Sequence, residues 1–354
     1  MKCRVLILGA SYGSLLGTKL LMAGHDVTLV CTAPTAELIN REGTVVRFPL
    51  RGAESSIVDV ASSHLPGALA ACAPDEADPA AFDLVVLGMQ ECQYGAPGVR
   101  TLMTRIAQAR KPCLAIMNMP PLPYLKRIPG LRTEALEGCY VDAKVWAGFE
   151  PGLMSLASPD PQAFRPAERP KNVLQVGLPT NFKAAPFEDE ASTALLRRLE
   201  SDIEQARYAH GDAALEIPVK LKVHDSIFVP LAKWPMLIAG NYRCIRPDDM
   251  IPIKEAVHGN VAKSREVYDW VAELCGRLGA QSADLVPFEK YAKAAEGLGK
   301  PSSAARALFN GAQHIERVDS LVRRIARQLG LHSDTLHEIV RLVDERLGRN
   351  RLAR

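Results

Sequence analysis

The first thirty residues constrain the fold of this chain more than any other stretch. Val5–Leu8 is a short apolar run, the pattern of a strand buried on both faces of a parallel sheet. A turn bounded by Gly9 and Gly13 follows, and leucines then recur at helical spacing. Gly24 ends that helix, and Val27–Val30 begins a second apolar run. This strand–helix–strand unit predicts an α/β fold with a mostly parallel, doubly wound sheet.

The glycine turn predicts a site for the pyrophosphate of a dinucleotide. The G-x-G-x-x-G pattern needs glycine at positions 9, 11 and 14, whereas this chain has Gly9, Ser11 and Ser14, with Gly13 one residue early. Gly9 permits a tight turn, and a helix that begins near Gly13 directs free backbone N–H groups at an anion. Ser11 is small and can donate a hydrogen bond. We therefore expect Gly9, Ser11, Tyr12 and Gly13 to contact the cofactor; the strand–helix–strand context disfavours a turn that merely joins two elements.

The residues after the second strand bear on the choice of cofactor. An acid here binds the ribose of NAD, and a basic residue binds the 2′-phosphate of NADP. This chain has Cys31 and Thr32, and its next acid is Glu37. Thr32 and a helix that starts near Ala36 could bind a phosphate, although Thr35 is equally well interpreted as a plain N-cap. The sequence favours NADP (NADPH) and leaves NAD open.

Composition excludes several other classes of protein. The eight cysteines show no C-x-x-C spacing, which indicates neither a metal site nor a disulfide framework. A net charge of +3 is too small to indicate nucleic-acid binding. The sequence shows no signal peptide and no apolar stretch of ~18 residues that would predict a membrane span. We expect a cytoplasmic protein with a small-molecule substrate and no nucleic-acid or membrane partner.

Two further buried strands place polar side chains where a cofactor crevice should open. Phe82–Gln90 ends in Gln90, with Gln93 shortly after it, and the strand within Pro112–Pro121 ends at Asn118. Ligands of doubly wound sheets bind outside the carboxyl ends of the strands. We therefore expect Gln90, Gln93 and Asn118 near the cofactor.

The alternation of strands and helices weakens after residue 143. Short strands are also predicted at Thr44–Phe48, Ser56–Val60 and Asn172–Leu178, the last of which closes the first domain. Helices are predicted over 188–206, 222–239, 261–279, 285–296, 302–329 and 334–348. The predicted organisation is a Rossmann-type NAD(P)-binding domain at 1–182 and an all-α substrate and dimerisation domain at 183–354.

Five colinear motifs resemble the ketopantoate reductase family: GSLLGTKLLMAGHDVTLV, AELINREG, LAIMN, EIPVKL and KPSSAARALFNG. The resemblance covers nearly the whole chain. It implies hydride transfer between a nicotinamide cofactor and a 2-oxo acid or related ketone, and it is compatible with a homodimer. It also implies that Asn118 lies at the nicotinamide, that Lys220 of EIPVKL is catalytic, with Lys222 as the reserve, and that Ser303 binds a substrate carboxylate.

The chain departs from this family at several of the positions that carry its function. Thr32 replaces an arginine, Gln90 a lysine, and His224 and Phe228 two asparagines. Near the C-terminal motif, His314 stands at the position of a glutamate and Glu316 lies one helical step beyond it. We expect His224, His314 and Glu316 to bind a substrate that is not ketopantoate itself.

The chemistry requires an ammonium group near the carbonyl oxygen, because hydride addition builds negative charge there. Partial burial would lower the pKa of Lys220 into a useful range. His224, four residues on along the predicted helix, would share its face. The alternative for Lys220 is an ordinary solvated lysine with no catalytic role. A non-catalytic dinucleotide-binding or sensing protein is the alternative function, and the PSS motif argues against a β-hydroxyacid-type dehydrogenase.

Overall fold

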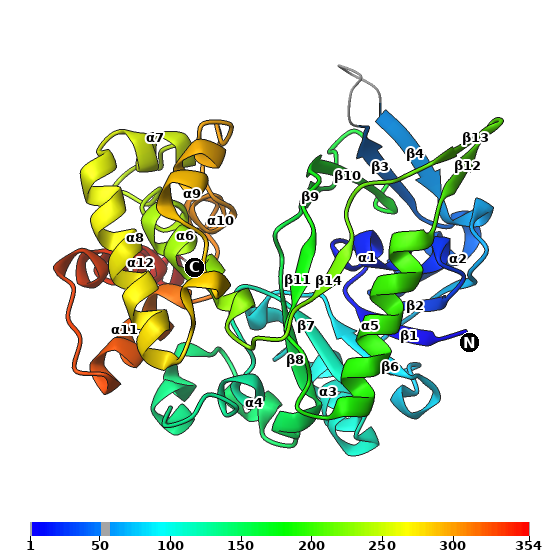
Figure 1. Cartoon of the computed structure of the whole chain (residues 1–354), viewed down its shortest axis with the longest axis horizontal. Coiled ribbons are helices and arrows are strands. Elements are labelled where there is room, and N and C mark those ends of the chain that lie inside the picture. The colour runs from blue at the N-terminus through cyan, green and yellow to red at the C-terminus, as the bar shows by residue number, and fades with distance from the viewer. Residues whose placement is uncertain (1, 51–56, 354) are drawn as a thin grey trace. The chain divides into compact units, whose positions relative to one another are not determined.

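The computed structural model describes residues 2–50 and 57–353 (Figure 1). The chain divides into two compact units. The first comprises Met1–Met89, Gln93–Tyr124 and Lys144–Ile227, and the second comprises Gln90–Cys92, Leu125–Ala143 and Phe228–Arg354.

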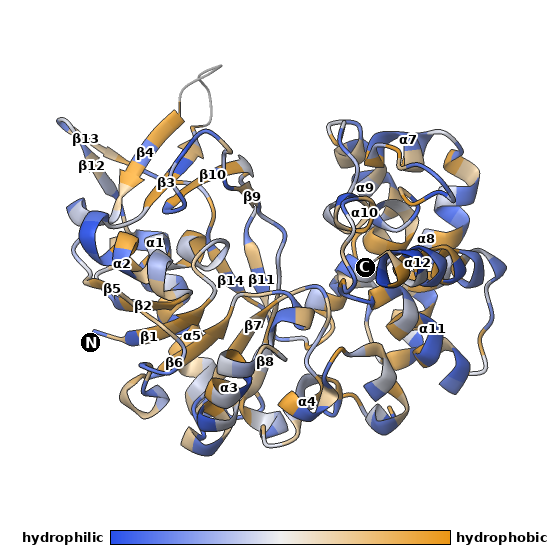
Figure 2. Cartoon of the chain, turned by 180° about the vertical axis from the view of Figure 1, so that it is seen from behind, coloured by the Kyte–Doolittle hydropathy of each residue, from blue (hydrophilic) through white to orange (hydrophobic). Residues whose placement is uncertain are grey.

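An eight-stranded sheet organises the first unit and confirms the predicted α/β class. Six adjacent strands of this sheet, β5, β2, β1, β6, β7 and β8, run parallel to one another. Strand β11 is antiparallel to β8, and β14 is parallel to β11. In spatial order the strands are β14 (Leu221–Val223), β11 (Phe182–Ala184), β8 (Met154–Ser158), β7 (Cys113–Ile116), β6 (Leu84–Leu87), β1 (Arg4–Leu8), β2 (Asp26–Val30) and β5 (Leu69–Cys72). In Figure 2 the strands of this sheet are mostly hydrophobic.

The helices of the first unit differ from the prediction at two points: the helix after β2 begins at Ala33 and not near Ala36, and the predicted helix over 188–206 belongs to this unit and not to the second domain. The helices are α1 (Gly13–Met22), α2 (Ala33–Glu42), α3 (Pro97–Ala109), the short α4 (Leu122–Leu125) and α5 (Glu190–Gln205). All ten residues of α1 are buried, because it lies against β1 and β2 of the large sheet and also contacts α5 and β3. This complete burial fixes the helix that follows the glycine turn.

The other predicted strands of the first domain form a second, smaller sheet. Its order is β4 (Ile57–Ala61), β3 (Val45–Pro49), β10 (Val173–Leu178) and β9 (Gln162–Phe164). Ser56, the predicted start of one strand, lies outside the described residues. The short hairpin β12 (Tyr208–His210) and β13 (Ala213–Leu215) was not anticipated.

The structure differs from the prediction most clearly between 183 and 239. The predicted boundary at 182/183 falls inside β11, and the first unit continues to Ile227. The predicted helix over 222–239 is wrong at its start, where Leu221–Val223 is β14. Burial alternates between buried and partly exposed residues from 219 to 223, the period of a strand. Only then do the short helical turns η7 (Val229–Ala232), α6 (Lys233–Met236) and η8 (Leu237–Asn241) follow.

The second unit is helical, as predicted. Apart from the isolated bridge Ile245↔Met250, the residues described in this unit form helices and loops only. The predicted helix over 302–329 is interrupted between 310 and 317. The longer helices are α7 (Ile253–His258), α8 (Val261–Leu278), α9 (Phe288–Ala295), α10 (Ser303–Phe309), α11 (Val318–Gln328) and α12 (Asp334–Leu352).

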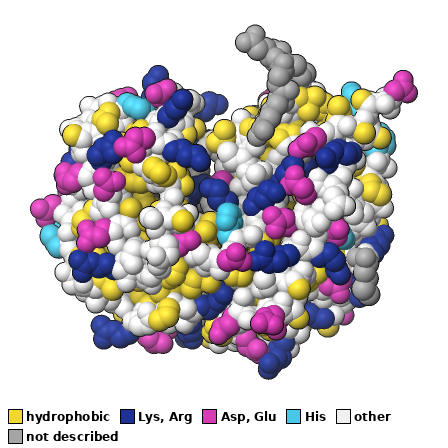
Figure 3. Space-filling view, in the orientation of Figure 1, with side chains coloured by type: hydrophobic (Ala, Val, Ile, Leu, Met, Phe, Trp, Pro, Cys, Tyr) yellow, Lys and Arg dark blue, Asp and Glu magenta, His cyan; other side chains and the backbone are white. Residues whose placement is uncertain are grey.

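No helix in 2–50 or 57–353 is long and apolar enough to cross a membrane. The same residues contain no group of three or more His, Cys, Asp or Glu placed to hold a metal ion. On the face shown in Figure 3, basic and acidic side chains are interspersed.

Candidate functional site

The glycine turn has the backbone geometry that a tight phosphate turn requires. Gly9 has φ +102°, a conformation that side chains rarely adopt, and a Cβ there would lie 2.7 Å from Met89 Cγ and 2.9 Å from Gly88 O. Because the residues directly after β6 approach this closely, only glycine fits at position 9.

Gly13 provides the close helix–strand contact that position 14 cannot provide in this chain. A Cβ at Gly13 would lie 2.6 Å from Ile7 Cγ2 in the middle of β1. Helix α1 begins at Gly13 with no side-chain cap and no acid in its first turn, so the end of the helix that attracts anions is open. The N–H groups of Ser14 and Leu15 donate to the carbonyls of Ser11 and Tyr12, at 3.3 and 3.1 Å. The turn therefore fits a pyrophosphate although its spacing is irregular.

Ser11 and Tyr12 are both engaged with the protein itself. The carbonyl of Ser11 accepts a hydrogen bond from Ser14 Oγ at 2.8 Å. The Tyr12 hydroxyl donates to the carbonyl of Pro161 at 2.6 Å, and its ring meets Phe182 edge-on with centroids 5.8 Å apart. Burial and then Asp160 raise the pKa of Tyr12 well above its usual value. The segment that contains Pro161 therefore lies against the glycine turn.

The end of β2 lacks an acid, as the sequence shows, but its helix starts earlier than expected. Thr32, not Thr35, occupies the N-cap position of α2, because Pro34 sets the first helical turn. Thr35 is buried inside the helix, and the two threonine hydroxyls are 3.0 Å apart. Burial raises the pKa of the neighbouring Cys31 thiol to about 11. This strand end is thus uncharged at neutral pH.

Asn118 lies at the same edge of the sheet as the glycine turn. Strand β7 ends at Ile116, two residues before it, and β7 neighbours β6 in the parallel part of the sheet. Gln90 and Gln93 are both exposed and follow β6 in a loop that contains the short turn η3 (Glu91–Gln93).

Lys220 also lies at this edge, immediately before β14. Its N–H donates to Asn181 Oδ1 at 3.0 Å, and the preceding Val219 has φ +69°. Its ammonium forms ion pairs with Glu204 of α5 and, at 2.5 Å, with Glu216. Burial acts to lower the pKa of Lys220, but the two carboxylates outweigh it and the pKa is raised. The expected depression of this pKa is therefore wrong.

The strand order sets the distance between Lys220 and the nicotinamide position. Strands β11 and β8 separate β14 from β7, so three strand spacings, about 14 Å, lie between the backbones that carry Lys220 and Asn118. Lys222, the reserve candidate, binds Glu204 at 2.7 Å. Both lysines are therefore held by the acidic side chain of α5.

His224 does not relate to Lys220 as a helix would place it. Its N–H donates to the carbonyl of Ala184 at 2.9 Å, which continues the ladder of β14 and β11. The two residues share a face by the alternation of a strand, but four residues of strand span about 13 Å. The predicted helical pairing of the two residues is therefore wrong.

In the second unit, the serine motif caps a helix as its sequence suggests. Ser302 is the buried N-cap of α10: its hydroxyl accepts from the N–H of Ala305 at 3.1 Å and donates to the carbonyl of Asn241 at 2.7 Å. Ser303 is the exposed first residue of the helix. The division of roles leaves the Ser303 hydroxyl at the surface of this unit.

His314 and Glu316 lie in a non-helical connection before α11, so the predicted helical step between them is wrong. The Tyr242 hydroxyl determines this shape: it donates to the carbonyl of Glu316 at 2.5 Å and accepts from the N–H of Val318 at 3.1 Å. His314 is exposed, and burial followed by Arg351 lowers its pKa.

Glu91, in the same unit, was missed by the sequence analysis. It is 2% exposed, its N–H donates to Glu316 Oε1 at 3.4 Å, and its carboxylate accepts from the N–H of Val141 at 3.1 Å. Burial, with help from Glu316, raises its pKa to about 7. An acid between two glutamines in a loop gives no sequence signal of burial.

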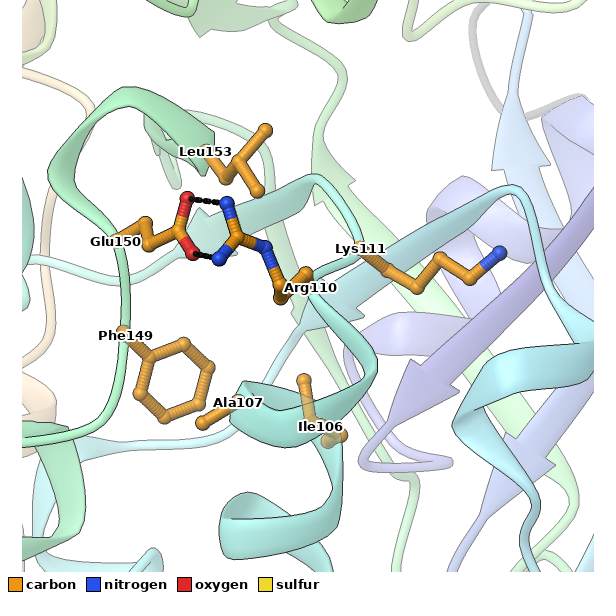
Figure 4. A pocket seen from close by; sticks show the side chains of 7 residues that line it. All are labelled: Ile106, Ala107, Arg110, Lys111, Phe149, Glu150 and Leu153. Atoms are coloured by element: carbon orange, nitrogen blue, oxygen red, sulfur yellow. Dashed lines mark hydrogen bonds and ion pairs between the residues drawn. The ribbon is translucent and has the colours of Figure 1, made fainter.

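A surface hollow in the first unit lies away from this edge. It encloses about 210 Å³, including open solvent, beside the end of α3. Figure 4 shows the two-pronged ion pair between Arg110 and Glu150 that closes one side, with N–O distances of 2.9 and 3.0 Å. Small-molecule sites are usually larger, and this hollow precedes β7 rather than following it, so it is not the candidate site.

No protein-family model matches the sequence. No curated protein matches it either. Solved structures do match over nearly the full length, and they confirm the fold. D-mandelate dehydrogenase, in a ternary structure with NADH and anilino(oxo)acetate, is 14% identical with a TM-score of 0.65 and covers 98% of this chain and 99% of its own.

Two ketopantoate reductases give similar values. The 2-dehydropantoate 2-reductase from Methylococcus capsulatus is 15% identical with a TM-score of 0.67, covering 98% of this chain and 97% of its own. The dimeric ketopantoate reductase from Staphylococcus aureus is 11% identical with a TM-score of 0.62, covering 98% and 99%. The expected Rossmann-plus-helical fold is thereby shown.

Proposed function

We propose that this chain is an NADPH-dependent oxidoreductase that interconverts a 2-oxo acid, or a related ketone, and the matching alcohol. The observation that carries the proposal is that the glycine turn, Asn118 and Lys220 all lie at one edge of the large sheet. The parallel strands β1 and β7 end at this edge, and β14, which runs in the opposite direction, begins there. The fold shared with D-mandelate dehydrogenase and the ketopantoate reductases supports this class of reaction.

The chain's own residues divide the work. Gly9 and Gly13 let the backbone approach a pyrophosphate, and the first N–H groups of α1 stabilise its charge. A nicotinamide cofactor, when bound, would supply the hydride to the substrate carbon or accept it in the reverse direction. Asn118, just after the end of β7, orients the nicotinamide.

Lys220 is the proposed proton donor to the carbonyl oxygen, and it takes the proton back in the reverse direction. The raised pKa keeps its ammonium charged at neutral pH. To act, the ammonium must exchange its ion pairs with Glu204 and Glu216 for the substrate oxygen. We further propose that Ser303, His314 and Glu316 of the second unit, together with His224, contribute to substrate binding, and that the chain forms a homodimer.

The test compares Lys220→Ala with Lys222→Ala, a matched control because both lysines bind Glu204. Turnover is measured with NADPH and a panel of 2-oxo acids, and cofactor affinity by NADPH fluorescence. We expect Lys220→Ala to lose about 10²- to 10⁴-fold in kcat with an unchanged Kd for NADPH, and Lys222→Ala to stay within a few-fold of wild type. Near-normal turnover of Lys220→Ala contradicts the assignment.

A non-catalytic dinucleotide-binding protein is the second candidate, and the two ion pairs of Lys220 favour it, since they occupy the proposed acid. It predicts NADPH binding without turnover in either direction on any 2-oxo acid or 2-hydroxy acid tested. Turnover of a single substrate that is abolished in Lys220→Ala rules this candidate out.

A further inference from the structure

Residues 159–165, which we call the crossing segment, run along the carboxyl edge of the large sheet. The segment leaves the end of β8, where Ser158 Oγ and Lys183 Nζ both bind Asp160, the latter at 3.2 Å. Its Pro161 carbonyl accepts from Tyr12 in the glycine turn after β1 at 2.6 Å. It then forms β9 and reaches Arg165. The segment therefore spans from β8 past the end of β1.

Arg165 brings a cation to the end of β2. Its guanidinium is close enough to the Cys31 thiol to act on it electrostatically. The side chain is partly buried, and in residues 2–50 and 57–353 no carboxylate forms an ion pair with it. Other basic residues of this unit do have such partners, for example Lys183 with Asp160 and Arg47 with Asp59 at 2.9 Å.

The residues that directly follow β2 carry no charge. Cys31 and Thr32 follow β2, and the first turn of α2 contains no acid. This is the place where a dinucleotide presents the ribose of its adenosine. An acid here would repel a phosphate on that ribose, whereas a partly desolvated guanidinium matches a phosphate dianion in both charge and two-pronged geometry.

We propose that Arg165 binds the 2′-phosphate of NADP(H) and makes this chain prefer NADP(H) over NAD(H), an inference that rests on the proposed function. The cation comes from the crossing segment, not from the strand end itself, where Thr32 stands. Arg165 is thus a specificity-determining residue that a comparison of β2 ends alone would miss.

The experiment measures dissociation constants of NADPH and NADH by fluorescence for wild type, Arg165→Gln, Arg165→Lys and Arg169→Gln. Arg169 is the matched control, since it is an exposed arginine in the same connection. Competition by 2′,5′-ADP and by 5′-AMP isolates the phosphate. Thermal melts confirm that each variant is folded.

We expect Arg165→Gln to raise the dissociation constants of NADPH and 2′,5′-ADP by about 10- to 100-fold, while those of NADH and 5′-AMP change less than threefold. Arg165→Lys, which keeps the charge but not the two-pronged geometry, should lie between it and wild type, and Arg169→Gln should bind as wild type does. If wild type binds dinucleotides but Arg165→Gln leaves NADPH unchanged, or weakens NADPH and NADH equally, the inference fails and the proposed function stands. If wild type binds neither dinucleotide, both fail.

Discussion

Replacing Gly13 with alanine tests whether this residue carries the function of the missing third glycine. The new Cβ would lie 2.6 Å from Ile7 Cγ2, whereas 3.4 Å is the lower end of ordinary contact. Ile7 is fully buried in β1 and branched at Cβ, so its methyl group has little freedom to rotate away. Helix α1 is buried along its whole length and cannot simply move outward.

Two opposing effects set the size of the change. Alanine is favoured over glycine in a helix by up to about 1 kcal/mol, and overpacking a well-packed core costs about 1–3 kcal/mol. At Gly17, one turn further along α1, a Cβ would be 3.4 Å from Val27 Cγ1, so only the first effect applies. We expect Gly13→Ala to be less stable than wild type by about 1–2 kcal/mol, and Gly17→Ala to be equally or more stable.

Urea unfolding followed by circular dichroism gives both stabilities, and NADPH fluorescence gives the affinity. The clash lies where α1 meets the proposed pyrophosphate, so Gly13→Ala should also weaken the binding of NADPH by about tenfold or more. Gly17→Ala should leave this affinity unchanged. Ile7→Leu removes the Cγ2 methyl and should rescue Gly13→Ala in a double-mutant cycle. If Gly13→Ala is as stable as Gly17→Ala and binds NADPH as tightly, the assigned role of Gly13 is wrong.

Three further predictions concern buried charges. Burial raises the pKa of Glu91 to about 7 from 4.5, so between these values the folded state holds a proton that the unfolded chain releases. Wild type should therefore lose stability relative to Glu91→Gln as the pH rises from 5 to 7. The same dependence of melting temperature on pH in both proteins would refute this. Burial lowers the pKa of Lys19 to about 7 from 10.5, so wild type should gain stability relative to Lys19→Met as melts are repeated from pH 7 towards 10. Asp319 is fully buried and accepts two hydrogen bonds from Arg317 at 3.0 Å, so Asp319→Asn should lower the free energy of unfolding by about 3–5 kcal/mol. A loss under 1 kcal/mol in urea unfolding would show that the other ion pair of Arg317, with Asp344 at 2.7 Å, suffices.

The parts of the fold that the sequence predicts are those that depend on local pattern. The apolar runs of β1, β6 and β7, the start of α1 and the helices of the second unit follow directly from periodicity. The second sheet does not, because β3 pairs with β10 across more than a hundred residues. At Lys220 the alternation from Val219 to Val223 indicates a strand, but the apolar residues that follow predicted a helix that begins at 222.

The same division explains the candidate site. Asn118 and the glycines could be proposed from the sequence because a strand end and a tight turn are local features. The burial of Glu91 depends on Val141, and the ion pairs of Lys220 depend on Glu204, so neither the raised pKa of Glu91 nor that of Lys220 has a local signal. A pKa is set by all groups packed around a side chain, and a sequence pattern does not specify them.

Glycines that allow close backbone contact and side chains that supply a charge differ in how freely their positions can change. This difference accounts for which motif positions vary in this chain. A close backbone approach requires glycine at the point of contact, so the shortened turn keeps Gly9 and moves its second contact by one residue to Gly13. A guanidinium requires only that its flexible side chain reach the site, so any segment that passes nearby can carry it. Thr32 can therefore replace an arginine without loss of the positive charge when Arg165 reaches the end of β2 from the crossing segment. Absence of a charged residue at a motif position is thus weaker evidence against a ligand than absence of a glycine.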